Sequence, residues 1–322
     1  MTNSAVAMEQ TNVKDKKQVR FSPLQRREIR WGLIFISPWV IGFLLFTLIP
    51  TLASLGFSFT NYNPIRPEET ELVGFSNYAR LFSDPFMRQA IGVTLRFTLI
   101  SVPIGLIVPL GLALLVNSEH LFGKNFFRAL FYLPSMIPVV VNVMVWGGIL
   151  NSQSGWLNNT IKFLLGIEGP RWFEDEAYVV PALTIMGLWG VGNFMIIMLA
   201  GLQNVPTELY DASKVDGATW WQRFRNVTLP LISPIIFYTL VLSLIGSFQY
   251  FVQAFIIGNG RGEPNGATMF YNLYLYRTAF NVLDMGYGAT LAWLMFAFVL
   301  LLTIVLFRTQ DRWVFYAGGE QK

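Results

Sequence analysis

Charged residues are absent from six long segments of the chain, and each segment is rich in Leu, Ile, Val and Phe. These segments lie between Arg30 and Arg66, Arg96 and Glu119, Arg128 and Lys162, Glu176 and Glu208, Arg225 and Arg261, and Asp284 and Arg308. A bilayer core about 30 Å thick needs about 20 apolar residues of helix. The pattern therefore predicts six membrane spans, near Trp31–Phe57, Gln89–Val116, Leu130–Leu150, Val179–Leu202, Leu229–Ile257 and Tyr287–Phe307.

These spans are predicted to be helical, because an unpaired backbone group in lipid costs several kcal/mol and only helices and closed barrels avoid that cost. Barrel strands would alternate in polarity over about ten residues, and the six segments do not alternate. Prolines lie in or near the spans, from Pro38 to Pro181. We interpret them as kinks that neighbouring groups satisfy. The expected fold is an all-α membrane protein with six transmembrane helices.

The composition agrees with a lipid environment. Hydrophobic residues make up 53% of the 322 residues and charged residues only 13%, whereas soluble domains contain about 25% charged residues. The net charge of +4 is too small to indicate a nucleic-acid partner. Cysteine is absent and His120 is the single histidine, which argues against thiolate or histidine metal sites and against disulfides.

The basic residues predict the orientation of the spans. With the N-terminus inside, 15 of the 23 Lys and Arg residues fall on the cytoplasmic side, as the positive-inside rule requires. We expect a cytoplasmic and partly disordered segment at 1–30, a six-helix domain at 31–308 and a cytoplasmic tail at 309–322, with both termini in the cytoplasm. The first apolar segment is too long for the core of a cleaved signal peptide, so we expect it to be retained.

The middles of the spans contain no Asp, Glu, Lys, Arg or His, and Arg96 lies near the outer end of its span, where its side chain can reach the interface. Transporters driven by an ion gradient usually place such residues at membrane depth. The pattern therefore argues against proton coupling and indicates that energy comes from elsewhere. A self-sufficient secondary transporter or channel stays open as an alternative, as does a membrane scaffold that only anchors partners.

The loop from Asn204 to Pro234 reads NVPTELYDASKVDGATWWQRFRNVTLPLISP and predicts two short helices separated by a sharp turn. Pro206 ends the fourth span, and Thr207 is predicted to cap the first short helix. Glu208 and Asp211 then fall near the start of this helix, where its dipole favours negative charge. Gly217 suits the left-handed residue that ends such a helix.

The second short helix is predicted from Thr219 and Gln222, which have capping-box spacing. Pro230 is expected in the first turn of the fifth span, where its missing N–H costs little. On these patterns alone, a structured connector is favoured over a docking element.

The same loop resembles the cytoplasmic signature of bacterial ABC importer permeases. That signature, Glu-Ala-Ala, a glycine and then Leu-Pro, falls here on Asp211-Ala212-Ser213, Gly217 and Leu229-Pro230. The form with Asp216-Gly217-Ala218 and Thr228–Leu231 is similar to the sugar permeases of the maltose-type group. This chain departs from the signature by Asp for Glu and Ser for the second Ala. Further similarity in 74–85, 127–138 and 258–280 extends the resemblance over about residues 30 to 310.

The resemblance implies a type I ABC importer permease in the bacterial inner membrane. Its expected partners are a second homologous permease subunit, a cytoplasmic ATPase dimer, an extracytoplasmic solute-binding protein and a small-molecule substrate, such as a sugar, polyol or sugar phosphate. The chain has no G-x-x-x-x-G-K-[ST] motif, so ATP is expected on the partner ATPase, and the permease itself is expected to be neither an enzyme nor bound to a cofactor. The ATPase-coupling residues implied are Glu208, Asp211, Ala212, Ser213, Asp216, Gly217, Ala218, Leu229 and Pro230.

Polar and aromatic residues near mid-membrane are candidates for the solute path: Trp189, Gly190, Asn193, Ser243, Ser247, Gln249, Tyr250 and Gln253. Amides, hydroxyls and aromatic rings are the groups that bind sugars. The resemblance places Trp189, Gly190, Asn193, Gln249 and Tyr250 where maltose-type permeases hold substrate. Packing is the alternative, because polar groups also bond helices together in membranes and small residues such as Gly187, Gly190 and Gly192 let helices approach.

Overall fold

The computed structural model describes residues 22–316, and this part of the chain is helical except for turns, loops and one isolated bridge between Thr60 and Leu72. It divides into two units, 1–54 and 55–322. The expected disorder at the N-terminus falls mainly on residues 1–21, and the end of the expected tail on residues 317–322. Both therefore lie outside the described residues.

The first unit is a helical segment that begins earlier than predicted. Helix α1 (Pro23–Phe43) starts eight residues before Trp31, because Ser22 and Gln25 form a capping box and Pro23 occupies the first turn. A π-helical turn at Leu44–Leu48 follows, directly before α2 (Ile49–Phe57). Pro50, which lacks an N–H, lies just after this turn, and the wider turn accommodates the missing hydrogen bond.

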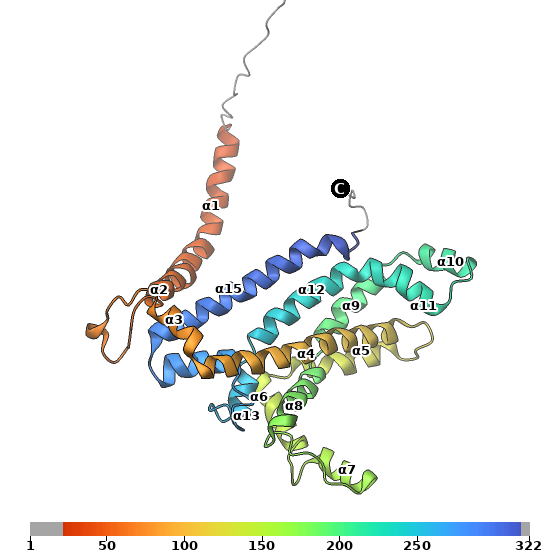
Figure 1. Ribbon diagram of the computed structural model, residues 1–322. Coiled ribbons are helices and arrows are strands. Elements are labelled where there is room, and N and C mark those ends of the chain that lie inside the picture. The colour runs from red at the N-terminus through yellow and green to blue at the C-terminus, as the bar shows by residue number, and fades with distance from the viewer. Residues whose placement is uncertain (1–21, 317–322) are drawn as a thin grey trace, which may run out of the picture. The chain divides into compact units, whose positions relative to one another are not determined.

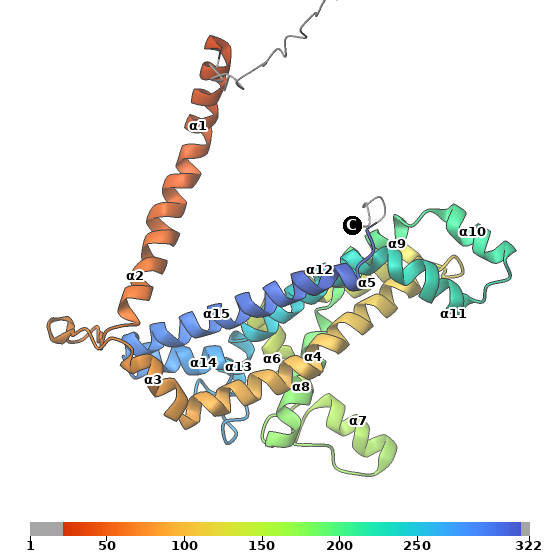
Figure 2. The same ribbon diagram turned by 45° about the horizontal axis from the view of Figure 1, so that its top comes forward.

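The second unit contains the remaining helices, which Figure 1 shows in chain order by colour. They are α3 (Ser76–Ser83), α4 (Pro85–Asn117), α5 (Lys124–Tyr132), α6 (Val139–Ile149), α7 (Trp156–Leu165), α8 (Glu176–Trp189), α9 (Gly192–Gln203), α10 (Thr207–Val215), α11 (Trp220–Arg223), α12 (Leu229–Phe248), α13 (Val252–Ile257), α14 (Tyr271–Tyr276) and α15 (Met285–Thr309). Helices α4, α12 and α15 are long, and Figure 2 shows them running along one another. Within residues 22–316, four helices are long and apolar enough to cross a membrane, or six if two bent pairs each form one span.

The predicted third span is not one helix. Helix α5 ends in a short 3-10 turn at Leu133–Met136, and α6 leaves it at an angle of 102°. Pro134, in the first turn of the 3-10 segment, and Pro138 lie on either side of the break. Ile137, which precedes Pro138, is extended, as a residue before proline prefers, and Pro138 then caps α6. The expected kink is therefore a sharp bend inside the span.

The fourth and fifth spans are also interrupted. Helices α8 and α9 meet at Gly190 and Val191 with a bend of 53°, and α12 ends before Gln249, three residues ahead of α13. Gly192 fixes the first break, because a Cβ atom there would overlap the backbone of Phe131 and Tyr132. Only glycine allows α9 to pack this closely on α5, so packing is one role of this residue.

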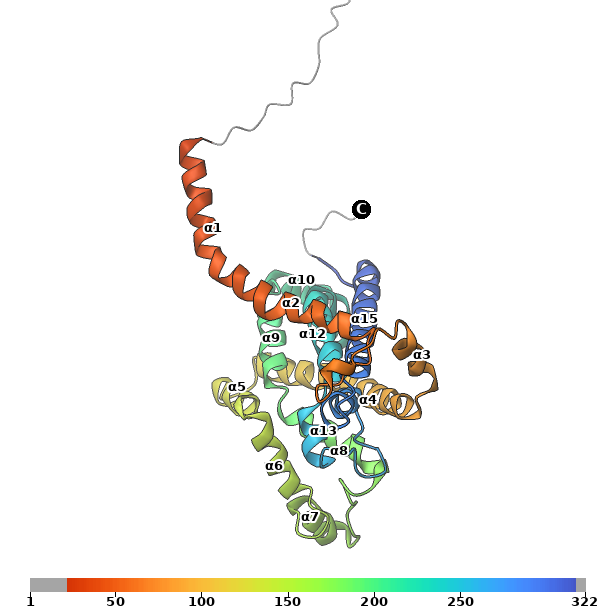
Figure 3. The same ribbon diagram turned by 90° about the vertical axis from the view of Figure 1, so that its left-hand side faces the viewer.

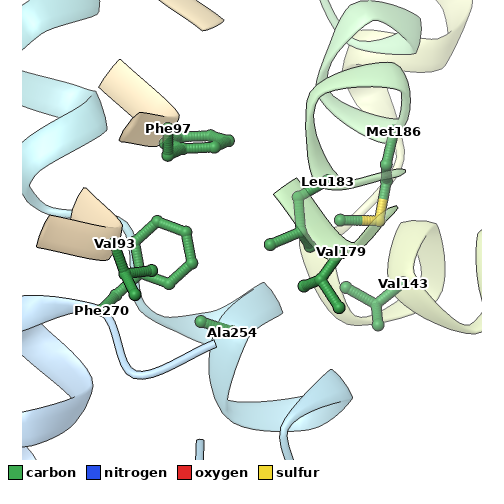
Figure 4. Packing of buried hydrophobic residues seen from close by; sticks show 8 residues of the cluster. All are labelled: Val93, Phe97, Val143, Val179, Leu183, Met186, Ala254 and Phe270. Carbon is green, nitrogen blue, oxygen red and sulfur yellow. The ribbon is translucent and has the colours of Figure 1, made fainter. Parts of the chain in front are cut away.

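Two apolar clusters form the core of the second unit. One joins α4, α6, α8 and α13, and Figure 4 shows its side chains meeting: Val93, Phe97, Val143, Val179, Leu183, Met186, Ala254 and Phe270. The other joins the opposite ends of α4 and α12 to α9 and contains Ala113, Val116, Met195, Met198, Leu199, Leu202, Val205 and Ile232. Helix α4 contributes to both clusters, and Phe97 and Ala113 are their nearest members along it.

A polar cluster joins the ends of α3, α4, α14 and α15. The buried carboxylate of Asp84 caps α4 and accepts hydrogen bonds from the hydroxyls of Tyr274 and Tyr287. Arg80 pairs with Asp284 at 2.7 Å and stacks on Tyr287. Burial alone would raise the pKa of Asp84, but the two tyrosine hydroxyls and the backbone donors of α4 hold it below its usual value. The ionised carboxylate therefore ties these helix ends together.

Candidate functional site

The loop between α9 and α12 contains the sharp turn predicted at Gly217. Gly217 is left-handed, with φ of +73°. The N–H of Ala218 donates to the carbonyl of Ser213 at 2.9 Å, and the N–H of Gly217 donates to Lys214 at 3.0 Å. This is a Schellman ending for α10. Asp216 is the C-cap residue, so the prediction of a glycine stop is confirmed.

The exposed face of α10 carries Asp211 and Ala212 of the signature, while Ser213 is half-buried and its hydroxyl donates to the carbonyl of Tyr210. Glu208, Asp211, Ala212 and Val215 recur at three- and four-residue spacing, which places them on one helix face, and all four are exposed. We call these four residues the docking face. The carboxylate of Asp211 pairs with Lys214 at 3.1 Å, and both side chains remain largely in solvent. The face therefore projects away from the bundle, where a second protein can reach it.

The opposite face of α10 is attached to the base of the fifth span. Tyr210 packs against the cluster around Leu202, and its hydroxyl lies 3.0 Å from that of the buried Thr228. This hydrogen bond is the side-chain link between α10 and the helix that continues into α12. The sequence pattern singled out neither residue for this role, because the contact joins positions 18 apart across the turn.

One detail of the predicted loop is wrong. The side chain of Thr207 makes no capping bond, and Pro206 is the N-cap residue. Pro230 lies in the first turn of α12, as predicted, but a longer helix that begins at Trp220 leads directly into α12 through a π-helical turn at Phe224–Thr228. The capping box of Thr219 and Gln222 is confirmed, and it starts this longer helix. The π-helical turn accommodates the missing N–H of Pro230.

A cavity of about 250 Å³ lies between α4, α8, α9 and α12. It shares Phe97 and Leu183 with the first apolar cluster and lies at the breaks of the fourth and fifth spans. Its walls are aromatic and small, with Phe97, Phe194 and Tyr250 beside Gly105, Gly187, Gly190 and Gly246. No Asp, Glu, Lys, Arg or His lines it.

Two hydroxyls at this cavity have no hydrogen-bond partner. The oxygens of Ser243 and Tyr250 are buried, and nothing in the described part of the chain pairs with them. A buried, unpaired hydroxyl costs about 1–3 kcal/mol, so a ligand or water that satisfies both would bind favourably. Tyr250 itself is fixed by ring contacts with Phe97 and Phe270, at 4.4 and 4.9 Å between centroids.

Of the predicted path residues, Gly190, Ser243, Ser247 and Tyr250 line the cavity. Ser247 is already used in packing, because its hydroxyl accepts from Thr98 at 3.0 Å and donates to the carbonyl of Leu244. The other four candidates do not line it. Asn193 and Gln249 are exposed at the two helix breaks, and Gln253 is half-buried in α13. Trp189 instead stacks edge-on against Trp146.

Helix α6 contributes two polar side chains that the sequence analysis missed. The amide oxygen of Asn142 and the indole N–H of Trp146 are both buried and unpaired. They are four residues apart and therefore share one face of α6, and Trp146 packs against the same cluster as Tyr250. The sequence does show a polar pair at this spacing in the third span. It does not show where the bend lies that presents the pair to the cluster.

A bundle of apolar helices with a cavity at its broken spans and a structured loop at one end is the architecture of a membrane transport protein. The chain belongs to the family of binding-protein-dependent transport system inner membrane components, whose model matches residues 101–315. It is thus a permease component of an ABC importer in the inner membrane. This membership argues against the secondary-transporter, channel and scaffold alternatives.

Several curated relatives resemble the chain over most of its length. The probable ABC transporter permease protein YesP of Bacillus subtilis (strain 168) is 38% identical over 299 residues, covering 92% of this chain and 95% of that protein. The trehalose/maltose transport system permease protein MalF of Thermococcus litoralis is 32% identical over 285 residues, covering 88% and 95%. The arabinooligosaccharides transport system permease protein AraP of B. subtilis is 31% identical over 274 residues, covering 84% and 86%.

Solved structures share the fold. A chain of a bacterial alginate ABC transporter, in complex with an alginate pentasaccharide-bound periplasmic protein, superposes with a TM-score of 0.76 at 22% identity, covering 90% of this chain and 96% of that one. A chain of a second structure, a bacterial ABC transporter involved in the import of alginate, gives 0.69 at 24% identity, covering 89% and 99%. The all-α permease fold predicted from the sequence is therefore confirmed.

Proposed function

We propose that this permease carries a neutral, hydroxyl-rich solute, a sugar or a related polyol, through the cavity at the breaks of α8–α9 and α12–α13. The unpaired hydroxyls of Ser243 and Tyr250 carry the proposal, because sugar hydroxyls both donate and accept hydrogen bonds. Aromatic walls suit the apolar faces of a sugar ring. The absence of ionisable lining residues disfavours a strongly charged solute. The names of MalF and AraP, which transport sugars, agree with this class.

The remaining polar candidates extend the same path. The exposed Asn193 and Gln249 stand at the breaks, and Asn142 and Trp146 offer an acceptor and a donor from α6. The cavity of about 250 Å³ is smaller than the roughly 300–1,000 Å³ of most small-molecule sites. A second homologous permease would complete it, with the exposed amides facing the partner. A soluble binding protein would deliver the solute from outside.

ATP would be hydrolysed by a separate cytoplasmic ATPase dimer, so the chain needs no cofactor of its own. The docking face of α10 would contact this ATPase, with Asp211 as its acid and Gly217 allowing close approach. Apart from its two chain neighbours, nothing in residues 22–316 lies within 4 Å of a Cβ atom placed on Gly217, so the open space there is available to another protein. Movement of the ATPase would then reach the spans through Tyr210 and Thr228. Both termini would lie on this cytoplasmic side.

The test is ATP-dependent uptake of a panel of sugars into proteoliposomes that hold the permease with its partner permease, ATPase and binding protein. Tyr250→Phe and Ser243→Ala each remove one unpaired hydroxyl and keep the packing. We expect the double variant to reduce solute affinity. Thr303→Ala, which removes a hydroxyl that bonds only within α15, is the matched control. Unchanged affinity in the double variant would exclude this cavity, and flux without ATP would exclude the importer mechanism.

A further inference from the structure

The loop between α6 and α8 holds a patch of exposed apolar side chains on and just after α7. Phe163, Leu164, Leu165 and Ile167 are between 58% and 87% exposed, and Trp156 at the start of α7 is 70% exposed. Figures 1 and 3 place α7 beyond the end of α6, on the side of the bundle away from α10. Large apolar patches on a protein surface mark a contact with another molecule or with lipid.

The loop is folded so that this patch stays outside. Asn158, which is 5% exposed, uses its amide to join the two ends of the loop. Its nitrogen donates to the carbonyls of Ser152 and Pro170 at 3.0 Å each, and its oxygen accepts from the indole of Trp172 at 2.7 Å. Gly169 must be glycine, because its Cβ would overlap the Asn158 side chain. Asn158 is therefore buried against its own loop, whereas Asn159 and Lys162 beside it on the polar side of α7 stay exposed, and the apolar side chains are presented outward.

We propose that α7 is an interfacial helix, whose side chains Phe163, Leu164 and Leu165, with Ile167 just after the helix, insert into the leaflet of the membrane on the side opposite α10. Helix α7 is tied to the ends of two spans by short connections, residues 150–155 and 166–175, so it cannot leave the membrane surface. Exposed apolar side chains continue from it along α6, with Val141 and Met144. A short amphipathic helix with Trp and Phe on its apolar side and Lys162 beside it suits the headgroup boundary.

A soluble binding protein is the other candidate occupant, and the chemistry of the patch disfavours it. Reversible protein interfaces are about as polar as an average surface, whereas the run from Phe163 to Leu165 contains no polar side chain. The nearest charges, Lys162 and Glu168, pair with each other at 3.8 Å at the edge of the patch. The proposal needs only the membrane location of the permease, so it does not depend on the identity of the solute.

The chain contains no cysteine, so a single introduced thiol can carry a spin label. Phe163→Cys and, as a second site, Leu164→Cys would be labelled in the full-length permease within the assembled transporter, reconstituted in phosphatidylcholine nanodiscs. Lys162→Cys is the matched control, because it is adjacent in sequence but points to a different side of α7. We expect power-saturation EPR to show labels at 163 and 164 that are open to oxygen and closed to a water-soluble nickel chelate, with the reverse at 162.

The same labels would be measured with and without the solute-binding protein. If these side chains insert into lipid, labels at 163 and 164 should be protected from the nickel chelate in the absence of the binding protein. Adding the binding protein should not change that protection. Labels at 163 and 164 that are as open to nickel as the label at 162, whether or not the binding protein later covers them, would overturn the proposal. The accessibility of the labels is measured independently of sugar uptake. Neither lost nor normal uptake in these variants would therefore change the conclusion about lipid contact.

Discussion

Replacing Tyr210 by Phe removes the side-chain hydrogen bond that fastens α10 to the base of the fifth span and leaves the ring packing in place. The hydroxyls of Tyr210 and Thr228 are 3.0 Å apart, and Thr228 is 4% exposed. Because α10 has no buried residue of its own, this bond and the Tyr210 ring are its principal attachments to the bundle. We therefore expect the variant to fold and insert normally, with α10 held less firmly.

The size of the effect follows from the bond. A neutral hydrogen bond contributes about 0.5–1.5 kcal/mol net, and about 1.4 kcal/mol corresponds to a factor of ten in an equilibrium constant. The population in which α10 is detached should thus rise about two- to thirteen-fold. The amides of α10 should exchange with deuterium faster by the same factor when exchange is limited by local opening.

Hydrogen–deuterium exchange of the reconstituted protein measures this directly, peptide by peptide. Peptides covering Thr207–Val215 should exchange faster in Tyr210→Phe, and peptides from α15 should not change. Tyr238→Phe, which removes a hydroxyl from an exposed tyrosine of α12, is the control. Equal exchange of α10 in Tyr210→Phe and in the unmodified chain would refute the proposed link. Solute imported per ATP hydrolysed should also fall if this link transmits the motion of the ATPase.

Three further outcomes are expected. Gly217→Arg should insert at normal levels but lose ATP-dependent uptake, because the new side chain occupies the space left for the ATPase; membrane fractionation and uptake assays check this, and full uptake would contradict it. Gly192→Val should lower the melting temperature in detergent, because its Cβ would overlap Phe131, whereas Gly187→Val, which has open space, should not. Asp84→Asn should cost about 1.5–3 kcal/mol at pH 7. The pKa of Asp84 lies below its unfolded value of about 3.9, so its stabilisation is present above that pH and lost as the pH falls through the lower folded value; thermal unfolding from pH 7 to pH 3 should show this loss in the unmodified chain and not in Asp84→Asn.

The sequence predicts the spans well, because a bilayer demands long runs of apolar residues whatever the tertiary contacts are. It does not predict where the spans break. Pro138 and Gly190 lie at sharp bends, while Pro103 and Pro109 lie inside the unbroken α4. A proline breaks a helix only where neighbouring helices do not satisfy the freed carbonyl, and neighbours are not visible in the sequence.

The candidate site also divides into features set by local backbone geometry, in the loop, and features set by helix packing, at the cavity. The turn at Gly217 and the capping box at Thr219 depend on local backbone geometry, so residue type and spacing are sufficient to predict them. The roles of Tyr210, Asn142 and Trp146 depend on which helices pack together. Ser243 and Ser247 illustrate the limit, because both are serines one turn apart in α12, yet only Ser247 finds a partner, the Thr98 hydroxyl of α4.

The helix that starts at Trp220 runs through the π-helical turn at Phe224–Thr228 into α12 and reaches Phe248, and this continuity lets it act as a lever arm. At 1.5 Å per residue it is about 43 Å long, and it ends directly before Tyr250 at the cavity. If the end near Trp220 tilts by about 10° around a fixed point, the far end moves by about 7 Å. If α10 docks on an ATPase as proposed, a small rotation of α10 and α11 would be amplified to about the width of a sugar ring, and the length of one helix would set how far the proposed solute path opens for a given movement of the ATPase.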